Sequence, residues 1–331
     1  MPVVLVSTAT DVGRVRHNNE DYVKAERITR DDRHFRIWAV ADGVGGGPQG
    51  ERASLTAVET VVDYLANEPW SDPSVALSAA FSLANSNVFE ITGVGATAST
   101  LVVALVSETD RMVAIANVGD SRAYLVTDSV AWQITHDHSI VAARVAAGQL
   151  TAAEARTAPD RNVLTRGIGS EREVQVDVFG PRQLQPNQRL VLCSDGVHGM
   201  IEDSVIGQLG GGLAIAECAG ALVAAAVEAG GRDNATALVA GFELGARSVQ
   251  ASAPASAAAP KGMRRLPRRA ILVAIGVVVA ILLAVVLLNL MSSSPAKFVI
   301  PPGPSSGATS TLSGGPPTRH SNLPSQSLII R

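Results

Sequence analysis

The sequence predicts an α+β fold in which antiparallel sheets are covered by helices. Short apolar runs are broken by turns and follow one another directly, as in residues 113–126, where a Gly-Asp-Ser turn separates two runs. Longer segments with apolar residues three and four positions apart lie between groups of such runs. Strands that follow one another in hairpins favour mixed antiparallel sheets over a doubly wound parallel sheet.

The elements follow in order from the same periodicities. Apolar and β-branched runs predict strands over residues 3–9, 36–41, 99–107, 111–117, 121–126, 130–135, 173–178, 189–194 and 235–243. Helical periodicity predicts helices over residues 51–67, 73–91 and 213–230. These elements fill one globular domain over residues 1–245.

The C-terminal part is organised differently. Residues 270–290 are apolar except for Asn289 and would span roughly 30 Å as a helix, which predicts a single transmembrane span rather than a shorter, amphipathic core helix. Basic residues concentrate before the span: Lys261, Arg264, Arg265, Arg268 and Arg269, with only Lys297 close after it. This asymmetry predicts a single-pass protein of the plasma membrane whose N-terminal domain faces the cytoplasm.

Composition separates the remaining segments. Residues 246–269 form an Ala/Ser/Pro-rich and basic juxtamembrane linker, and residues 291–331 a Ser/Pro/Gly-rich tail expected to be disordered on the far side. Cys193 and Cys218 lack the spacing of a zinc or redox motif and are expected to be reduced core residues.

Charge is divided between the two parts of the chain. Residues 1–246 hold 18 basic and 30 acidic side chains, whereas residues 247–331 hold 9 basic and none acidic. A net charge of −12 over the first part repels nucleic-acid phosphates and suits a domain that collects cations. Nucleic acid is therefore not an expected partner.

Short acidic clusters recur beside apolar runs, at residues 19–21, 42–46, 119–122, 194–196 and 231–234. An aspartate beside glycine at a strand end places a carboxylate on a tight turn and leaves backbone carbonyls free to bind a cation. Each cluster alone is usually an ordinary turn, and Arg16 alone is a surface charge. Together they indicate a dispersed site for Mg²⁺ or Mn²⁺ rather than zinc or copper.

Such a site predicts a definite chemistry. Two divalent ions about 3.5–4 Å apart lower the pKa of a shared water and neutralise a phosphoryl group under attack. No protein nucleophile is then needed, which agrees with the lack of a Gly-x-Ser-x-Gly elbow. Arg16 would add a planar donor fork that matches two phosphate oxygens.

In their order along the chain, these motifs resemble the PPM (protein phosphatase 2C-type) metal-dependent Ser/Thr phosphatases, and the resemblance covers residues 7–243. The matching motifs are Thr10-Asp11-x-Gly13-x-x-Arg16-x-x-Asn19-Glu20-Asp21, Asp42-Gly43-x-Gly45-Gly46, Gly50-Glu51-x-Ala53-Ser54, Gly95-Ala96-Thr97-Ala98, Gly119-Asp120-Ser121-Arg122, Asp137-His138-Ser139, Arg161-Asn162-x-Leu164-Thr165-Arg166, Ser194-Asp195-Gly196 and Gly231-x-Asp233-Asn234. The resemblance implies a four-layer α-β-β-α sandwich of two antiparallel sheets flanked by helices.

The resemblance also implies roles for residues. Asp42 would bridge two metals and the Gly43 carbonyl would bind one of them. Asp195 and Asp233 would complete the first metal site, and Glu20 and Asp21 would hold metal-bound waters of the second. Arg16 would clamp the substrate phosphate, and Asp120 is a candidate ligand of a third metal.

The implied function is hydrolysis of phosphoserine and phosphothreonine in proteins, with two Mn²⁺ or Mg²⁺ ions per domain, opposing a cognate Ser/Thr kinase in bacterial signalling. Two alternatives are a catalytically silent domain of the same fold and a phosphatase acting on an anti-anti-sigma-type regulator. Val44 and Gly47 stand where some family members carry histidine. The acid that protonates the leaving group is therefore open between a metal-bound water, His136 and His138.

Residues 136–170 are expected to form a mobile flap. Within it, Asp137, Arg161 and Arg166 would be structural or substrate-facing, while Arg122 would make structural contacts.

Overall fold

The computed structural model describes residues 3–45, 48–92 and 97–243. Within these residues no helix has both the length and the apolar character needed to cross a membrane. The predicted linker, transmembrane span and tail lie outside the described residues, as do the boundaries between them.

Two antiparallel sheets form the centre of the domain. The first sheet contains, in spatial order, β1 (Val3–Asp11), β11 (Ala235–Glu243), β10 (Gln188–Cys193), β7 (Arg122–Thr127) and β8 (Val130–Gln133). The second sheet contains β2 (Asp21–Arg30), β3 (Arg33–Val44), β5 (Leu101–Ser107), β6 (Met112–Val118) and β9 (Asp177–Gln183), with the short β4 (Ala98–Ser99) pairing with β3.

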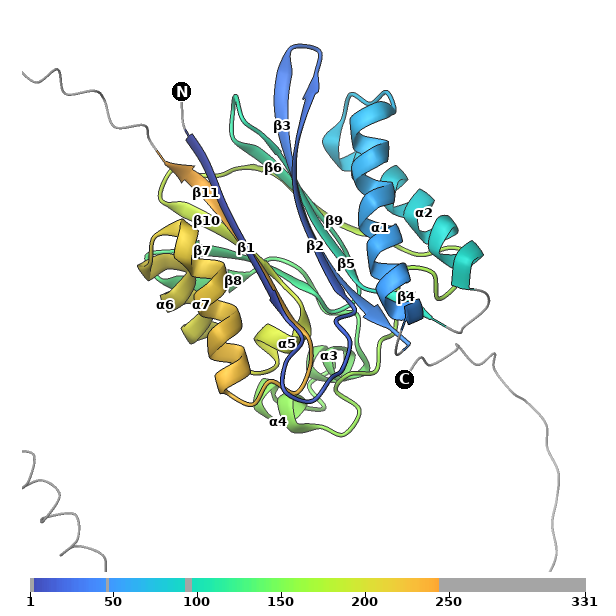
Figure 1. The fold of residues 1–331 in the computed structure, drawn as a ribbon, viewed down its shortest axis with the longest axis vertical. Helices are drawn as coiled ribbons and strands as arrows, with labels where there is room; N and C mark the ends of the chain where they lie inside the picture. The colour runs from blue at the N-terminus through green and yellow to red at the C-terminus, as the bar shows by residue number, and fades with distance from the viewer. Residues whose placement is uncertain (1–2, 46–47, 93–96, 244–331) are drawn as a thin grey trace, which may run out of the picture. The chain divides into compact units, whose positions relative to one another are not determined.

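Helices cover the outer face of each sheet (Figure 1). The pair α1 (Pro48–Asn67) and α2 (Pro73–Thr92) packs on the second sheet, and the pair α6 (Asp203–Gly212) and α7 (Ile215–Glu228) packs on the first. Between the sheets, side chains such as Trp38 of β3 and Leu192 of β10 form a fully buried apolar layer. The α+β class and the four layers are thus confirmed.

Three short helices gather at one end of the sheets, in the lower part of Figure 1. They are α3 (Ile140–Ala146), α4 (Ala152–Thr157) and α5 (Asp195–His198). The first two belong to the segment 136–170, called the flap below. Ser139 caps α3, and Thr151 and Glu154 form a capping box at α4, so local sequence accounts for both starts.

The predicted hairpin over residues 113–126 is wrong. β6 pairs with β5 and β9 in the second sheet, whereas β7 pairs with β10 and β8 in the first, so the Gly119–Asp120 turn carries the chain from one sheet to the other. Gly119 has φ +101°, which a side chain would disfavour. An apolar run on each side of a turn predicts two strands but not whether they pair with each other.

Other elements differ from the prediction for local reasons. The strand predicted over 173–178 lies instead at 177–183, after an irregular segment. β2 was missed because Lys24, Glu26 and Arg27 interrupt its apolar pattern on a half-exposed edge strand. The helix α6 was missed because its sequence, DSVIGQLGGG, is rich in glycine, which has low helix propensity.

Candidate metal-dependent active site

The acidic residues predicted from sequence lie at corresponding ends of the two sheets. Asp21 begins β2 and Asp42 lies near the end of β3, where the two are direct cross-strand partners. Asp195 follows β10 as the first residue of α5, and Asp233 lies two residues before β11. Like charges directly opposite on neighbouring strands repel each other, so this register calls for a cation.

Burial strengthens that repulsion. Burial, together with Asp21, Asp195 and Asp233, raises the pKa of Asp42 well above its usual range. Burial also raises the pKa of Asp21 to about 7, against hydrogen bonds from Thr236 and Ser194 that lower it. Loss of hydration and mutual repulsion therefore both disfavour the charged forms of these carboxylates.

The site also contains Asp120. Burial raises the pKa of Asp120 well above its usual range, and Asp195 and Asp137 raise it further. For Asp195, burial and Asp233 raise the pKa to about 6, while a hydrogen bond with Asp42 opposes the shift. The sequence-predicted carboxylates of both sheets, Asp120 included, therefore interact in one electrostatic cluster.

The donor set fits hard divalent cations. Asp21 Oδ1 and Asp195 Oδ1 are buried without a hydrogen-bond partner. Burial of an unpaired carboxylate oxygen carries a free-energy penalty, which a bound cation would relieve. Among the described residues, no three His, Cys, Asp or Glu side chains converge as a ready-made metal site. The second oxygen of Asp21, Oδ2, accepts a 2.7 Å hydrogen bond from Ser194 Oγ.

Arg16 lies beside this cluster. Its Nη2 donates to Asp233 Oδ2 at 2.8 Å, and its side chain is about half exposed. Partial burial lowers the pKa of Arg16, but Asp233, Glu20 and Asp42 outweigh this and raise it. A guanidinium that is fixed at one end and open to solvent at the other is suited to bind a phosphate.

Glu20 is placed by contacts that the sequence did not reveal. Its backbone N–H donates to Asn234 Oδ1 at 2.9 Å, and its carbonyl accepts from Ser54 Oγ at 2.6 Å. A Cβ at Gly50, in the first turn of α1, would overlap Glu20 Oε2, and one at Gly43 would overlap the Gly50 backbone. Glycines at both positions let the predicted carbonyl ligand, the helix start and Glu20 pack together.

Asp42 is held by a second group of contacts. Its N–H donates to Thr100 Oγ1 at 2.9 Å, and its carbonyl accepts from Thr100 N at 2.8 Å and from Ser99 Oγ at 3.0 Å. Thr100 Oγ1 also pairs with Ser121 Oγ at 2.7 Å, next to Asp120. Ser99 and Thr100 were not predicted as site residues, because hydroxyl side chains within strand-like runs carry no distinct sequence signal. Ser194 belongs to a predicted motif, but its bond to Asp21 was not predicted.

The structure shows the contacts of two arginines that the sequence analysis singled out, Arg122 and Arg161. Arg122 donates to both carboxylate oxygens of Asp137 at 2.7–3.1 Å, which confirms a structural role for Arg122. The charge of Arg161 opposes the rise in the pKa of Asp195, while its Nη1 donates to the Ala158 carbonyl at 3.5 Å within the flap. Cys193 and Cys218 are free and buried, as predicted.

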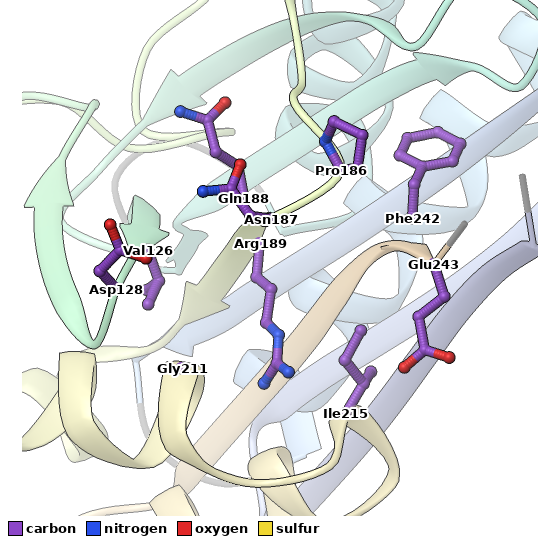
Figure 2. Close-up of a pocket in the computed structure, with 10 residues that line it drawn as sticks. All are labelled: Val126, Asp128, Pro186, Asn187, Gln188, Arg189, Gly211, Ile215, Phe242 and Glu243. Atoms are coloured by element: carbon purple, nitrogen blue, oxygen red, sulfur yellow. The ribbon is translucent and has the colours of Figure 1, made fainter. Parts of the chain in front are cut away.

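A pocket of about 240 Å³ lies at the opposite end of the first sheet, at the start of β10 and the end of β11. Figure 2 shows Arg189 reaching toward the helical segment at Gly211 and Ile215. Its Nη1 donates to the carbonyls of Gly210 and Leu213 at 2.8 and 2.7 Å. Arg189 thus donates hydrogen bonds to carbonyls at the end of α6. The pocket is remote from the acidic cluster.

Comparison with known proteins gives a consistent picture. A family model described as Protein phosphatase 2C matches residues 14–209. The serine/threonine phosphatase stp of Listeria monocytogenes (serotype 4b, strain F2365) is 32% identical over 260 residues, covering 73% of this chain and 98% of that protein.

Solved structures agree with these sequence matches. The crystal structure of the Mycobacterium tuberculosis serine/threonine phosphatase PstP/Ppp aligns with a TM-score of 0.65 and 30% identity over 74% of this chain and all of that one. The catalytic domain of PstP in complex with two manganese ions aligns with a TM-score of 0.62 and 30% identity over 73% of this chain and all of that one. The chain therefore belongs to the Protein phosphatase 2C family of metal-dependent Ser/Thr phosphatases.

Proposed function

We propose that the domain hydrolyses phosphoserine and phosphothreonine in proteins at the acidic end of its two sheets, using two Mn²⁺ or Mg²⁺ ions. The observation that carries the proposal is the cluster of Asp21, Asp42, Asp195 and Asp233, in which Asp21 is buried and the other three are partly buried, with Arg16 bonded to Asp233. In this proposal Asp42, the Gly43 carbonyl, Asp195 and Asp233 hold the metals, and Glu20 and Asp21 support them.

The chain's own groups account for binding and orientation. The Arg16 guanidinium binds phosphate oxygens and, through Asp233, keeps the phosphate against the acidic cluster. Bound divalent cations supply the positive charge that acidifies a water and neutralises the phosphoryl group. Thr100 and Ser194 fix Asp42 and Asp21 before any ligand arrives, so little reorganisation is needed on binding.

We do not propose His138 as the acid that protonates the leaving group. That residue is 3% exposed, and both of its ring nitrogens lie within hydrogen-bond distance of protein groups. His136 is exposed and packs edge-on against Phe179 with ring centroids 5.5 Å apart, and no hydrogen bond ties it to the acidic cluster. A water within the site remains the candidate that these contacts favour.

The test is hydrolysis of a phosphothreonine peptide with Mn²⁺, with a chelator, and by the Asp42→Ala and Asp195→Ala variants. Metal-dependent turnover that either substitution abolishes would support the proposal. Absence of turnover from folded, Mn²⁺-bound protein with a panel of phosphopeptides would instead favour a silent binding module.

We also propose that residues 270–290 anchor the protein in the plasma membrane, with the phosphatase domain in the cytoplasm beside a Ser/Thr kinase whose products it dephosphorylates. Support comes from the apolar segment and from the basic residues that precede it. Protease treatment of intact spheroplasts should leave the N-terminal domain protected, and its digestion there would refute this orientation. We further propose that Asp120 is a ligand of a third metal ion in the active site.

A further inference from the structure

The turn that carries Asp120 is held from both sides by histidines. The Gly119 N–H donates to His138 Nδ1 at 3.0 Å, and the His138 N–H donates back to the Gly119 carbonyl at 3.0 Å. On the other side, His198 Nε2 lies 3.0 Å from the Asp120 carbonyl and is positioned to donate to it. The backbone on each side of Asp120 therefore depends on a buried imidazole.

These bonds determine the tautomer of His138. Since the Gly119 N–H donates to Nδ1, that nitrogen carries no proton, and the ring proton is on Nε2. Nε2 lies 3.2 Å from Asp177 Oδ2, so it donates to that carboxylate. His138 thus joins the Asp120 turn to Asp177 by two bonds of opposite direction.

Asp177, in β9, connects His138 to the C-terminal part of the flap. Its Oδ1 accepts from Arg166 Nη1 at 2.8 Å, and Arg166 also donates to the Gln175 carbonyl at 3.1 Å. The neighbouring Thr165 N–H donates to the His138 carbonyl at 2.8 Å. The C-terminal part of the flap is therefore bonded to the His138 side chain through Asp177 and directly to the His138 backbone.

The same end of the flap also reaches Asp42. Ile168 and Ser99 exchange backbone hydrogen bonds at 2.7 and 2.9 Å, and Ser99 Oγ donates to the Asp42 carbonyl at 3.0 Å. Asp42, in β3, and the Asp120 turn thus share one support, the flap segment 164–168.

We propose that His138, in the N-terminal part of the flap, is a positioning residue that links flap residues 164–168 to the Asp120 turn, so that a protein substrate bound against the flap sets the position of the Asp120 carboxylate. The inference rests on the proposed phosphatase function and adds to it a preference for protein substrates over small phosphate esters. A phosphoprotein that contacts the flap benefits from the connection, whereas a small phosphate ester that reaches only the acidic cluster does not.

Two substitutions of His138 separate its two bonds. His138→Asn keeps an acceptor near the position of Nδ1 and removes the donor to Asp177. His138→Gln keeps a donor near the position of Nε2 and removes the acceptor for Gly119. Arg166→Gln, at a half-exposed position, cuts the connection at the flap without touching the buried histidine.

The experiment measures Mn²⁺ binding by calorimetry, and kcat and KM for a phosphothreonine protein and for p-nitrophenyl phosphate, with melting temperature recorded for each variant. His138→Gln should weaken Mn²⁺ binding at one site about tenfold. His138→Asn and Arg166→Gln should bind Mn²⁺ as the original protein does but raise KM for the phosphoprotein several-fold and leave the small ester unchanged.

Folded variants that match the original protein in Mn²⁺ binding and in both KM values would overturn the inference. So would losses that are equal for both substrates and follow the melting temperature, because these indicate a purely structural role. If the His138 variants do not fold, the Arg166→Gln variant tests the inference by itself. An unchanged ratio of its KM for the phosphoprotein to its KM for p-nitrophenyl phosphate would overturn the inference. A lack of phosphatase activity in the original protein would refute the proposed function, while the Mn²⁺ titration of His138→Gln would still test the link to Asp120.

Discussion

At the scale of single residues, the site depends on small groups as much as on its carboxylates. Gly50 gives Glu20 the space it occupies, Ser194 engages Asp21, and Thr100 holds the backbone of Asp42. None of these groups would bind a metal in the proposed arrangement. Each of them fixes a group that would bind or support one, so their substitution should alter metal binding more than folding.

Gly50→Ala should weaken Mn²⁺ binding, and with it any phosphatase activity, at least tenfold, because the new methyl group overlaps the Glu20 carboxylate. The matched control is Gly220→Ala in α7, where a Cβ meets nothing within 4 Å. That control should raise the free energy of unfolding by about 0.5–1 kcal/mol and leave Mn²⁺ binding unchanged. Calorimetric titration and urea unfolding check both, and equal Mn²⁺ affinities of the two variants would contradict the role of Gly50.

Arg16→Lys should lower kcat/KM for a phosphopeptide about tenfold, because lysine supplies a single point donor in place of a planar fork. The exposed Arg182→Lys on β9 is a control with the same chemical change and should have no effect. Steady-state kinetics at saturating Mn²⁺ measure the difference. An Arg16→Lys enzyme with unchanged kcat/KM would show that the guanidinium does not bind the phosphate.

At the scale of elements, the β2–β3 pair carries charged contacts at the end opposite to the site. Arg27 Nε and Arg36 Nε donate to Glu108 Oε1 at 3.0 and 2.5 Å, and thus join both strands to the end of β5. Partial burial raises the pKa of Glu108, but the bonds from Arg27 and Arg36 outweigh it and lower the pKa below its usual range. This network ties the edge strand β2 to its sheet.

The Glu108 network predicts a pH dependence of stability. Because its pKa is lower in the folded than in the unfolded chain, Glu108 stabilises the fold above the unfolded-state pKa, and this contribution is lost as pH falls through the folded-state pKa. Glu108→Gln should therefore be less stable than the original protein near pH 7, and the difference should shrink below about pH 4. Urea unfolding across pH 3 to 7 measures it, and a pH-independent difference would contradict the assignment.

At the scale of the molecule, the domain brings together acidic residues from segments that are far apart in sequence. Asp21, Asp42, Asp195 and Asp233 are all near the same ends of strands from two different sheets. Their mutual repulsion opposes folding, and a bound cation that recognises only the folded chain relieves it. Stability of the whole domain should therefore be linked to metal concentration.

Mn²⁺ should raise the melting temperature of the protein. The free energy of unfolding should rise by about 2.7 kcal/mol when the Mn²⁺ concentration is one hundred times the dissociation constant of the site. Asp42→Asn should abolish most of this gain, because it removes a carboxylate shared by the cluster. Asp63→Asn, at an exposed position of α1, should keep it. Thermal unfolding with Mn²⁺ and with chelator decides between them, and an equal gain in both variants would place the metal elsewhere.

The sequence by itself determined the family, the α+β class and the identity of the main acidic residues. Motifs such as Asp42-Gly43 and Ser194-Asp195-Gly196 keep their chemistry wherever the chain folds, and alternation of apolar residues marks strands such as β5 and β11. These signals are local, which is why a single chain could reveal them. The segments after residue 243, including the predicted transmembrane span, stay predictions from sequence.

Only the tertiary structure decided which strands pair and what supports each carboxylate. The turn at Gly119 and Asp120 looks like a hairpin in sequence, yet it crosses between sheets, because pairing depends on partners such as β9 and β10 that are distant along the chain. For the same reason His138 was a candidate proton donor in sequence, whereas in the fold it is buried with its ring bonded to the Gly119 N–H and to Asp177. Hydrogen-bond partners are set by packing in three dimensions, and residue spacing along one chain does not encode them.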